Sequence, residues 1–313
     1  MSDPKLSHEA LVGDLRALGL EKGSRVVVHS SMRSIGWVPG CAEQVVDCLL
    51  EAIGDSGLLV APTFTYTSTR FDPVATPGRT GAVSEALRRH PDAARSLHPF
   101  YSMAAVGPDA DVLLSGHEEL PGTAVGSPLN RLAESGGFVL LLGVGHVANT
   151  TIHVGEFRAG AGYLDIPFDP SWPSAAAIAI GGTQPRRVAY ERFPGCSRAF
   201  GAVEGALRAA GTVRDGRIGR ANSQLVPGSA VIEATVATLE DDPAGLLCTD
   251  PRCYRCPRAR EAQEGRSRPR SGRGSRSMIA SIWSSGTGGS DVPAIGSLTE
   301  RSPAAVSVGV AMG

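Results

Sequence analysis

The chain has 313 residues, of which 42% are hydrophobic and 19% charged, so it is long enough to bury one large core or two modest ones. Its formal net charge of -1 argues against a general basic surface of the kind that binds nucleic acid or an anionic membrane. The N-terminal segment MSDPKLSHEA has no apolar signal-like stretch and no window approaches the roughly 18 apolar residues of a membrane helix, so we expect a globular cytoplasmic protein with no nucleic-acid or membrane partner.

Helices and buried strands alternate through the first half of the chain. Residues 7–19 predict an amphipathic helix, with Ser7 placed to cap it and Gly19 to end it in a left-handed turn. The apolar run in RVVVHS, residues 25–30, predicts a strand covered on both faces. This alternation predicts an α/β fold with a central mixed, largely parallel sheet flanked by helices. The other predicted helices span residues 41–53, 83–89 and 128–133, and the other predicted strands span residues 57–61, 102–107 and 138–145.

A different arrangement follows in the second half. Two β-like runs around GGTQP, between residues 175 and 190, predict a hairpin. Residues 203–211 and 229–239 predict helices, which complete an appended α+β region. From about residue 265 the chain is rich in Arg, Gly and Ser without apolar periodicity, which predicts a disordered tail.

The segment LLLGVGHVANTTIHVGE places polar and titratable side chains directly after an apolar strand. In open α/β sheets, ligands bind beyond the carboxyl ends of the strands. If Asn149 or Thr150 caps a helix, His153 lies in its first turn and Glu156 follows three residues later, near enough for contact. A carboxylate beside an imidazole orients it and stabilises its protonated form, which suits a general base. A capped helix with a satisfied histidine is the alternative, and spacing alone leaves both open.

A second polar segment, SSMRSIGWVPG, follows the strand that ends in His29. Hydroxyl and backbone N–H groups of Ser30, Ser31 and Ser34, helped by Arg33, suit phosphate or amide oxygens of an elongated cofactor. The G-x-G-x-x-G dinucleotide spacing is missing, and serine-rich turns often only cap helices.

A third segment, RSLHPFYSMAAVG, leads into a predicted strand. It places Arg95, Ser96 and His98 in a loop that we expect to be exposed. Taken alone, this segment is a surface turn fixed by Pro99.

Four segments in register resemble motifs of the aminoglycoside 3-N-acetyltransferases: HSSMRSIGWVPG, PTFTYT, RSLHPFYSMAAVGP and LLLGVGHVANTTIHVGE. The resemblance runs from about Ser7 to Glu264 and implies the antibiotic N-acetyltransferase fold, which is distinct from the common N-acetyltransferase superfamily. It also implies acetyl-coenzyme A (acetyl-CoA) as co-substrate. The domain it implies spans residues 1–264, with a coenzyme-binding core over about 7–160, a hairpin-containing substrate region over about 161–264, and the tail at 265–313 beyond it.

The resemblance also implies roles for individual residues. His153 matches the family's catalytic histidine and Glu156 its acidic neighbour, while Thr150 or Thr151 borders the thioester. The residues that match the coenzyme-binding turn and the facing wall of the cleft are His29, Ser30, Ser31, Arg33, Ser34, Ile35, Thr63, Ser96 and His98.

The acceptor side departs from some related members, which carry a run of acidic and amide residues ahead of a cysteine. This chain reads AYERFPGCSRAF there, with Glu191 as the only carboxylate, and the departure bears on the substrate more than on the reaction. A charged side chain that only contacts solvent in a loop is the alternative interpretation for each acidic residue considered. The candidate partners for substrate ammonium groups are Asp72, Asp165, Asp169 and Glu191.

The six cysteines do not predict a disulfide framework in a long cytosolic chain, so we expect free thiols. Cys253 and Cys256 form a C-x-x-C pair with Cys248 upstream, but no second pair lies at zinc-site spacing, so we expect no metal. Cys196 is the best-placed nucleophile, although direct transfer from a thioester needs none.

The resemblance predicts acetyl-CoA-dependent acetylation of an aminoglycoside at the 3-amino group of its 2-deoxystreptamine ring, which gives antibiotic resistance. His153, oriented by Glu156, would remove the amine proton. Two alternatives stay open: acetylation of another amine, such as a biosynthetic intermediate, and coenzyme binding without turnover. The expected partner is a small-molecule amine, and the expected assembly is a monomer or a homodimer.

Overall fold

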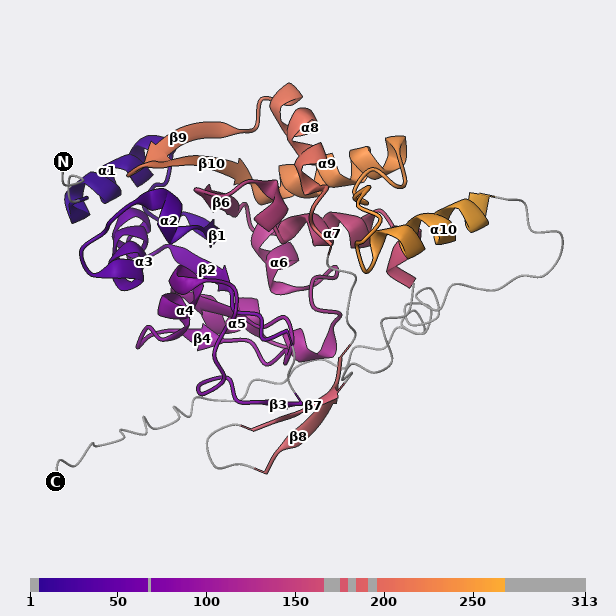
Figure 1. Cartoon of the computed structure of the whole chain (residues 1–313). Coiled ribbons are helices and arrows are strands. Elements are labelled where there is room, and N and C mark those ends of the chain that lie inside the picture. Colours follow the sequence, from indigo (N-terminus) through magenta and orange to yellow (C-terminus); the bar gives the residue numbers. More distant parts are fainter. Residues whose placement is uncertain (1–5, 67–68, 166–174, 180–183, 191–195, 268–313) are drawn as a thin grey trace, which may run out of the picture. The chain divides into compact units, whose positions relative to one another are not determined.

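The computed structural model describes residues 6–66, 69–165, 175–179, 184–190 and 196–267 (Figure 1). The chain divides into a unit over Met1–Ser271, which holds every described residue, and a second unit over Gly272–Gly313. The predicted tail begins inside helix α10 (Cys256–Ser267), so its first residues are helical. The rest of the predicted tail lies outside the described residues.

Seven strands form the larger sheet, in the spatial order β4-β5-β2-β1-β6-β10-β9. The central strand β1 is parallel to β2 and β6, and the other described pairs are antiparallel. The predicted mixed sheet flanked by helices is confirmed, but the prediction that it is largely parallel is wrong, because two of its described strand pairs are parallel and four are antiparallel. Its parallel pairs are confined to the centre because β9 and β10 form a hairpin at one edge and β4 and β5 turn back at the other. The bounds are β1 (Arg25–Ser30), β2 (Leu58–Pro62), β4 (Ala94–Arg95), β5 (Met103–Val106), β6 (Phe138–Leu142), β9 (Arg214–Ile218) and β10 (Ala221–Pro227).

Helices pack in two layers, one against each face of this sheet (Figure 1). Val26 and Val28 pack into the first layer and Val27 into the second, because side chains alternate across a strand. This is the two-sided burial predicted for the strand. The first layer holds α1 (His8–Leu18), α2 (Met32–Ile35), α3 (Cys41–Ile53) and α4 (Ala82–Arg88). The second holds α5 (Ala110–Leu114), α6 (Pro128–Glu134), α7 (Thr151–Arg158), α8 (Val203–Ala209), α9 (Gly228–Asp241) and α10.

The ends of two helices show how the sequence sets their length. The hydroxyl of Ser7 accepts a hydrogen bond from the N–H of Ala10 at 3.1 Å, and Gly19 ends α1 with a φ of 114°. Such a cap contributes about 1 kcal/mol, and the left-handed turn favours glycine. At α6, Ser127 caps the helix and Pro128 occupies its first turn, where a missing N–H costs nothing.

A smaller sheet joins the predicted hairpin to the segment after β2. Strands β7 (Ala175–Ile178) and β8 (Arg186–Ala189) pair antiparallel, which confirms the hairpin, and β3 (Arg70–Phe71) pairs parallel with β7. Part of the predicted GGTQP turn lies outside the described residues. The side chains of Phe71, Ile178 and Val188 pack together in a small apolar cluster of their own.

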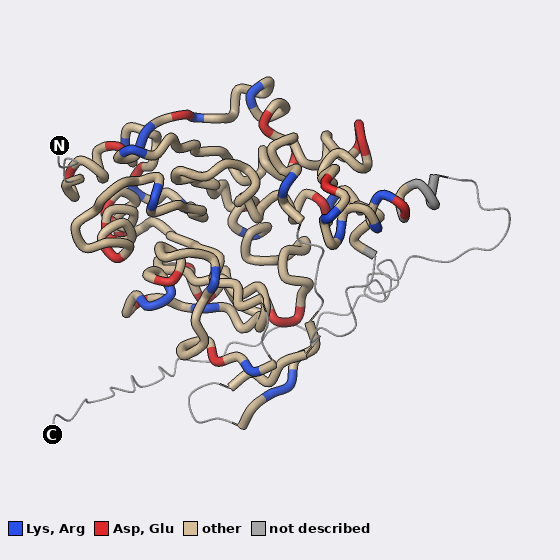
Figure 2. The backbone as a smooth tube through the Cα atoms, in the orientation of Figure 1, with Lys and Arg blue, Asp and Glu red and all other residues tan. Residues whose placement is uncertain are grey.

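Charged residues of both signs are interspersed along the described backbone (Figure 2). This distribution matches the near-zero formal net charge of the chain. Among the described residues, no helix is both long and apolar enough to cross a membrane.

Buried histidines make the fold sensitive to acid. Burial lowers the pKa of His29 to about 4, with a smaller contribution from His146, and burial also lowers the pKa of His117 to about 4. An unfolded histidine titrates near pH 6.5, so between these values the unfolded chain binds protons that the folded chain does not. Their contribution to stability is therefore complete above about pH 6.5 and is lost as the pH falls towards about 4.

We expect the free energy of unfolding to fall over this range by up to about 1.4 kcal/mol per pH unit for each of the two histidines. Urea unfolding at a series of pH values measures the slope. The variant His117→Gln should unfold with a shallower slope, because it leaves one such group fewer. A stability that stays flat between about pH 6.5 and 4.5 would contradict this expectation.

Candidate active site

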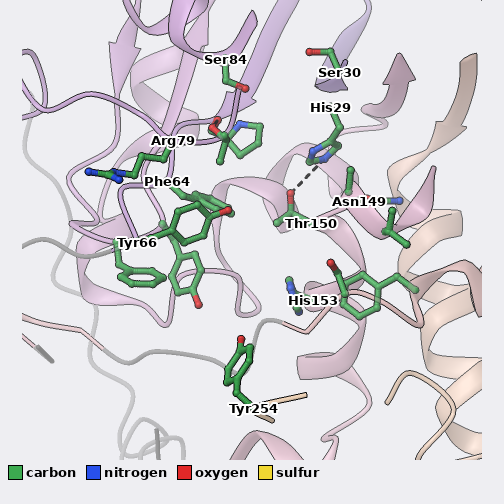
Figure 3. A pocket seen from close by; sticks show the side chains of 18 residues that line it. His29, Ser30, Phe64, Tyr66, Arg79, Ser84, Asn149, Thr150, His153 and Tyr254 are labelled. Atoms are coloured by element: carbon green, nitrogen blue, oxygen red, sulfur yellow. Dashed lines mark hydrogen bonds between the residues drawn. The ribbon is translucent and has the colours of Figure 1, made fainter. Parts of the chain in front are cut away.

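A cavity of about 550 Å³, called here the central cavity, lies at the carboxyl ends of the parallel strands (Figure 3). His29 and Ser30 end β1, Pro62 ends β2, and the segment 147–150 follows β6. This is where ligands bind in open α/β sheets. The remaining lining residues are Phe64, Tyr66, Arg79, Thr80, Ser84, Phe100, Tyr101, His153, Ser197, Phe200 and Tyr254.

Helix α7 begins at the rim of the central cavity. The side-chain oxygen of Asn149 accepts a hydrogen bond from the N–H of Thr151 at 3.1 Å, whereas the hydroxyl of Thr150 makes no capping bond. Asn149 therefore satisfies one of the free N–H groups at the start of the helix. His153 lies in the first turn and Glu156 three residues later, as the sequence predicts.

A hydrogen-bonded chain leads from the cavity into the core. The Nδ1 of His153 lies 2.5 Å from Oε2 of Glu156, and the hydroxyl of Tyr163 donates to the other carboxylate oxygen at 2.6 Å. Burial and then the Glu156 carboxylate raise the pKa of Tyr163 far above its usual range, which keeps this hydroxyl protonated. Because an ionised carboxylate only accepts, the hydrogen-bond network assigns the imidazole hydrogen to Nδ1. The Nε2 of His153 then keeps its lone pair and is the basic atom of the pair.

Two neighbours shape the space around His153. The ring of Phe200 packs edge-on against the imidazole, with 4.8 Å between ring centroids. The hydroxyl of Thr150 lies 3.3 Å from Nε2 of His29 (Figure 3). Burial, followed by the charge of His146, lowers the pKa of His29 to about 4, so His29 is neutral near pH 7. A neutral His29 and a hydroxyl thus offer polar groups to the cavity without adding charge.

The residues predicted to bind coenzyme separate into two groups. His29, Ser30 and Thr150 line the central cavity, but the turn that follows β1 does not. Ser31 is the N-cap of α2, and its hydroxyl accepts hydrogen bonds from the N–H and the hydroxyl of Ser34. Gly143 brings the end of β6 against this helix, because it has a φ of 71° and a Cβ there would lie 2.5 Å from the Cβ of Ser34. In the same turn lie Arg33, which is exposed, and Ile35, which is buried in the core.

The predicted facing wall is buried instead of exposed. Thr63 is 0% exposed and its hydroxyl donates to the carbonyl of Ser102, while Ser96 accepts from the N–H of Met103. His98 is also 0% exposed. These three side chains do not line the central cavity because they hold the loops beneath it.

The cavity wall itself is made by the neighbours of these buried residues. The ring nitrogen Nδ1 of His98 accepts hydrogen bonds from the N–H groups of Phe100 and Tyr101, at 3.2 and 2.9 Å. Burial, and then nearby His117, lowers the pKa of His98 well below its usual range, so Nδ1 remains free to accept. The phenyl and phenol rings that follow are thereby fixed in the wall.

The four acidic candidates are not brought together in the described structure. Asp72 is half-buried, and its Oδ1 accepts the N–H groups of Val74 and Ala75, so it shapes a turn away from the cavity lining. Asp165 lies in a short 3-10 helix (Gly162–Asp165), and its side chain is not described. The remaining two, Asp169 and Glu191, lie outside the described residues.

None of the aromatic residues that line the cavity was among the candidates named from the sequence. Phe64 and Tyr66 lie in the PTFTYT motif, where the alternating aromatic residues beyond a strand end were an available signal. Phe200 and Tyr254 come from distant parts of the chain, and nothing local indicates that they share a cavity with His153. Aromatic faces suit sugar rings and cationic groups, so this lining bears on the acceptor.

The fold and the site together define a class of protein. An α/β sheet places a histidine–carboxylate pair at its carboxyl edge, and the pair faces a cavity that also holds hydroxyl groups, amide groups and aromatic rings. These are the parts of an enzyme that removes a proton from a substrate by general-base catalysis.

Comparison with known proteins gives the family. Residues 27–240 match the family model described as aminoglycoside 3-N-acetyltransferase. Aminoglycoside N(3)-acetyltransferase IV of Salmonella sp is 33% identical, over 76% of this chain and 88% of the relative. Aminoglycoside N(3)-acetyltransferase VII of Streptomyces paromomycinus is 31% identical, over 77% of this chain and 93% of the relative.

Solved structures agree with the sequence matches. A histidine-to-alanine variant of aminoglycoside acetyltransferase AAC(3)-IVa, in complex with a gentamicin, is 31% identical with a TM-score of 0.74, over 84% of this chain and 99% of that one. The structure of AAC-IIIb with CoASH is 25% identical with a TM-score of 0.66, over 76% of this chain and 97% of that one. The chain therefore belongs to the aminoglycoside 3-N-acetyltransferase family. It is an acyltransferase with acetyl-CoA as co-substrate, and its fold differs from that of the common N-acetyltransferase superfamily.

Proposed function

We propose that this chain transfers the acetyl group of acetyl-CoA to the 3-amino group of the 2-deoxystreptamine ring of an aminoglycoside, and so gives resistance to the antibiotic. The observation that carries the proposal is the His153–Glu156 pair at the central cavity of a chain from this family. Solved relatives contain a gentamicin, apramycin and CoASH. The reaction takes place in the cytoplasm, where acetyl-CoA is available, and the chain acts as a monomer or a homodimer.

The central cavity suits the reacting parts of the two substrates in its chemistry. Its volume of about 550 Å³ lies within the range of small-molecule sites. Ser30, Thr150 and Asn149 offer hydroxyl and amide groups to the polar arm of an acyl donor. Ser31, Arg33, Ser34 and Ile35 belong to the turn just outside, and we propose that this turn holds the more distant part of the coenzyme.

Acetyl-CoA supplies an activated acyl group when it is bound. The nitrogen of the substrate amine bonds to the acyl carbon while the Nε2 of His153 accepts the amine proton. Glu156 stabilises the imidazolium ion that results. The carbon–sulfur bond breaks, and the imidazolium returns the proton to the departing sulfur. Hydrogen-bond donors of Thr150 and of the first turn of α7 stabilise the negative charge that develops on the carbonyl oxygen. Placing amine and acyl group together at Nε2 contributes a large part of the rate.

The acceptor is held by aromatic faces and by carboxylates. Tyr66 and Tyr254 line the same cavity as His153 (Figure 3), and the ring of Phe200 packs against the imidazole. Sugar rings stack and ammonium groups bind on such ring surfaces. Among the described lining residues there is no Asp or Glu, so we propose that Asp169 and Glu191 supply the carboxylates. Asp165 is a further candidate, and so is Asp72, although the carboxylate of Asp72 accepts hydrogen bonds within its own turn.

Another amine acceptor is the second candidate function. It is favoured by one observation, which is that the described lining carries Arg79 and aromatic rings but no carboxylate. A less cationic amine, such as a biosynthetic intermediate, would suit such a lining better than a polycation does. Coenzyme binding without turnover is the remaining alternative, and the intact His153–Glu156 contact counts against it.

Release of free thiol from acetyl-CoA separates these functions. We expect rapid release with 2-deoxystreptamine aminoglycosides and slow release with simple amines at equal concentration. If thiol release is fastest with a simple or biosynthetic amine, acetylation of that other amine is the function of the chain. Tight acetyl-CoA binding without release for any amine in the panel would identify a coenzyme-binding protein.

A further inference from the structure

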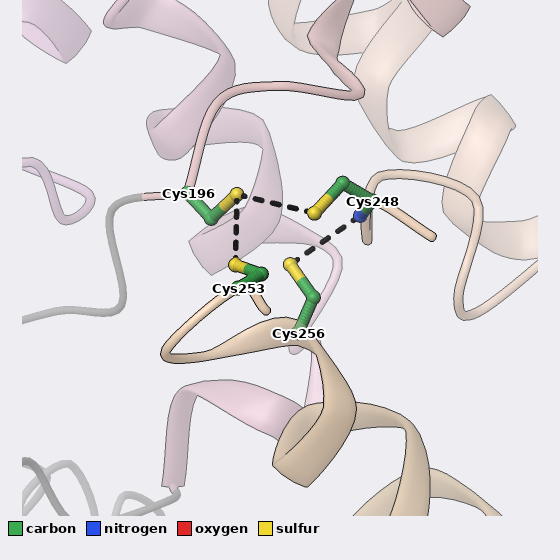
Figure 4. Close-up of side chains that lie close together, drawn as sticks. All are labelled: Cys196, Cys248, Cys253 and Cys256. Carbon is green, nitrogen blue, oxygen red and sulfur yellow. Dashed lines mark hydrogen bonds between the residues drawn. The ribbon is translucent and has the colours of Figure 1, made fainter. Parts of the chain in front are cut away.

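Four cysteine side chains converge on one point in the second helical layer (Figure 4). The sulfur atoms of Cys196, Cys248, Cys253 and Cys256 all lie within 4.8 Å of one another. Three of these residues are buried and Cys248 is half-buried. They come from separate parts of the chain, since Cys196 precedes α8 by several residues, Cys248 and Cys253 follow α9, and Cys256 begins α10.

The sulfur spacing is that of metal ligands and not of a disulfide. The Sγ of Cys196 lies 3.7 Å from that of Cys248 and 3.5 Å from that of Cys253. A disulfide needs about 2.05 Å, and the four thiols are free in the structure. Zinc–sulfur bonds of about 2.3 Å in a tetrahedron place neighbouring sulfurs about 3.8 Å apart. The observed distances therefore match the edge of a four-sulfur zinc site.

The surroundings also suit thiolate ligands. The backbone N–H of Cys248 points at the sulfur of Cys256 at 3.3 Å, which is the kind of contact that orients a thiolate ligand. Zinc with four thiolates carries a net charge of -2, and Arg198, Arg252 and Arg255 each lie within two residues of a ligand in the sequence. Arg198 and Arg252 also pair with the carboxylate of Asp250. The sequence spacing indicated only three possible ligands, because the fourth, Cys196, is distant in the sequence and joins the other cysteines only in the folded chain.

We propose that Cys196, Cys248, Cys253 and Cys256 bind one structural zinc ion. All four positions of the tetrahedron are taken by protein sulfur, so the ion has no open position for substrate and takes no part in the acyl transfer. The proposal replaces the expectation, drawn from sequence spacing, that the chain binds no metal.

The zinc site positions one wall of the central cavity. Ser197 follows Cys196, and Tyr254 lies between Cys253 and Cys256, and both line the cavity. In the same loop, the buried Arg255 donates a hydrogen bond to the carbonyl of Tyr163 at 3.1 Å, and Tyr163 is the residue that holds Glu156. The ion thus ties the segment before α10 both to the aromatic lining and to the support of His153.

Metal analysis of the full-length protein tests the proposal without any assay of activity. The protein is purified without a metal-affinity step, with a reducing agent and without a chelator, and its metals are measured by mass spectrometry. We expect about one zinc ion per chain. The variants Cys196→Ser and Cys256→Ser should each lose the ion, whereas Cys41→Ser, which alters an exposed cysteine outside the cluster, should keep it.

Replacement of zinc by cobalt gives a second readout that needs no variant. Co²⁺ added to the metal-free chain should give the strong visible absorption of a tetrahedral thiolate site, and zinc should abolish it. Removal of zinc should lower the melting temperature by at least about 5 °C, and zinc should restore it. Wild-type protein with less than about 0.1 zinc per chain and no cobalt absorption would overturn the proposal. A disulfide between Cys196 and Cys248 or Cys253 in protein kept under reducing conditions would overturn it too.

Discussion

The variant His153→Ala should lower kcat by roughly 10²- to 10⁴-fold while leaving acetyl-CoA binding nearly unchanged. The imidazole acts on the proton of the amine, so its loss removes an interaction made in the transition state and leaves the coenzyme contacts in place. Steady-state kinetics and a separate titration of acetyl-CoA binding measure the two quantities. The matched control is His90→Ala, which alters a histidine outside the cavity lining and should keep the wild-type rate.

The pH profile of the rate distinguishes a base from a merely structural histidine. A protonated imidazole cannot accept the amine proton, so the wild-type rate should fall on the acid side. That acid limb should be absent from the residual rate of His153→Ala. A folded His153→Ala protein with near wild-type turnover would contradict the assignment, and His29 or Glu191 would then be the candidates for the base.

The variant Glu156→Gln should have the second largest effect, a fall in kcat on the order of 10²-fold. Its amide would present an N–H to Nδ1 of His153, which favours the tautomer with the hydrogen on Nε2. The atom that must accept the amine proton is then already occupied. Steady-state kinetics should show the loss in kcat, with little change in the KM for acetyl-CoA.

Tyr163→Phe is the graded control for this effect. It removes only the 2.6 Å hydrogen bond to Glu156 and leaves the carboxylate in contact with His153. We expect a smaller loss than for Glu156→Gln. An unchanged kcat in Glu156→Gln, in protein with the wild-type melting temperature, would show that the carboxylate does not orient the imidazole.

Local signals predicted the regular part of the fold. The cap at Ser7, the turn at Gly19 and the apolar spacing between them define α1, and the helix observed over Cys41–Ile53 has the predicted bounds. These signals lie within a few residues of the elements that they specify. The fold class followed from the alternation of such elements.

The strands β9 and β10 escaped prediction for a physical reason. Of the residues in β9 only Ile218 is buried, because the strand lies at the sheet edge. The exposed arginines of this strand gave it the sequence pattern of a loop. Strand β10 is polar at Asn222 and Gln224, although it pairs along the whole of β6. Their place in the sheet depends on pairing with distant strands, which no local pattern reports.

In the candidate site too, contacts between residues near in the sequence could be predicted, and contacts between distant segments could not. The contact between His153 and Glu156 follows from a separation of three residues on one helix, so the sequence predicted it. The contact with Tyr163, the packing of Phe200 and the approach of Cys196 to Cys248 join distant segments. Those contacts exist only once the chain has folded, and the buried state of Ser96 and His98 was hidden for the same reason.

The position of the acetyl group on the product decides whether the chain is a 3-N-acetyltransferase of aminoglycosides. The wild-type protein is incubated with acetyl-CoA and a 2-deoxystreptamine aminoglycoside, and the product is assigned by nuclear magnetic resonance. We expect a single acetyl group on the 3-amino nitrogen, and a rate for His153→Ala that is lower by roughly 10²- to 10⁴-fold. Acetylation at another amine, a mixture of positions, or no acetylated aminoglycoside from protein that binds acetyl-CoA would contradict it.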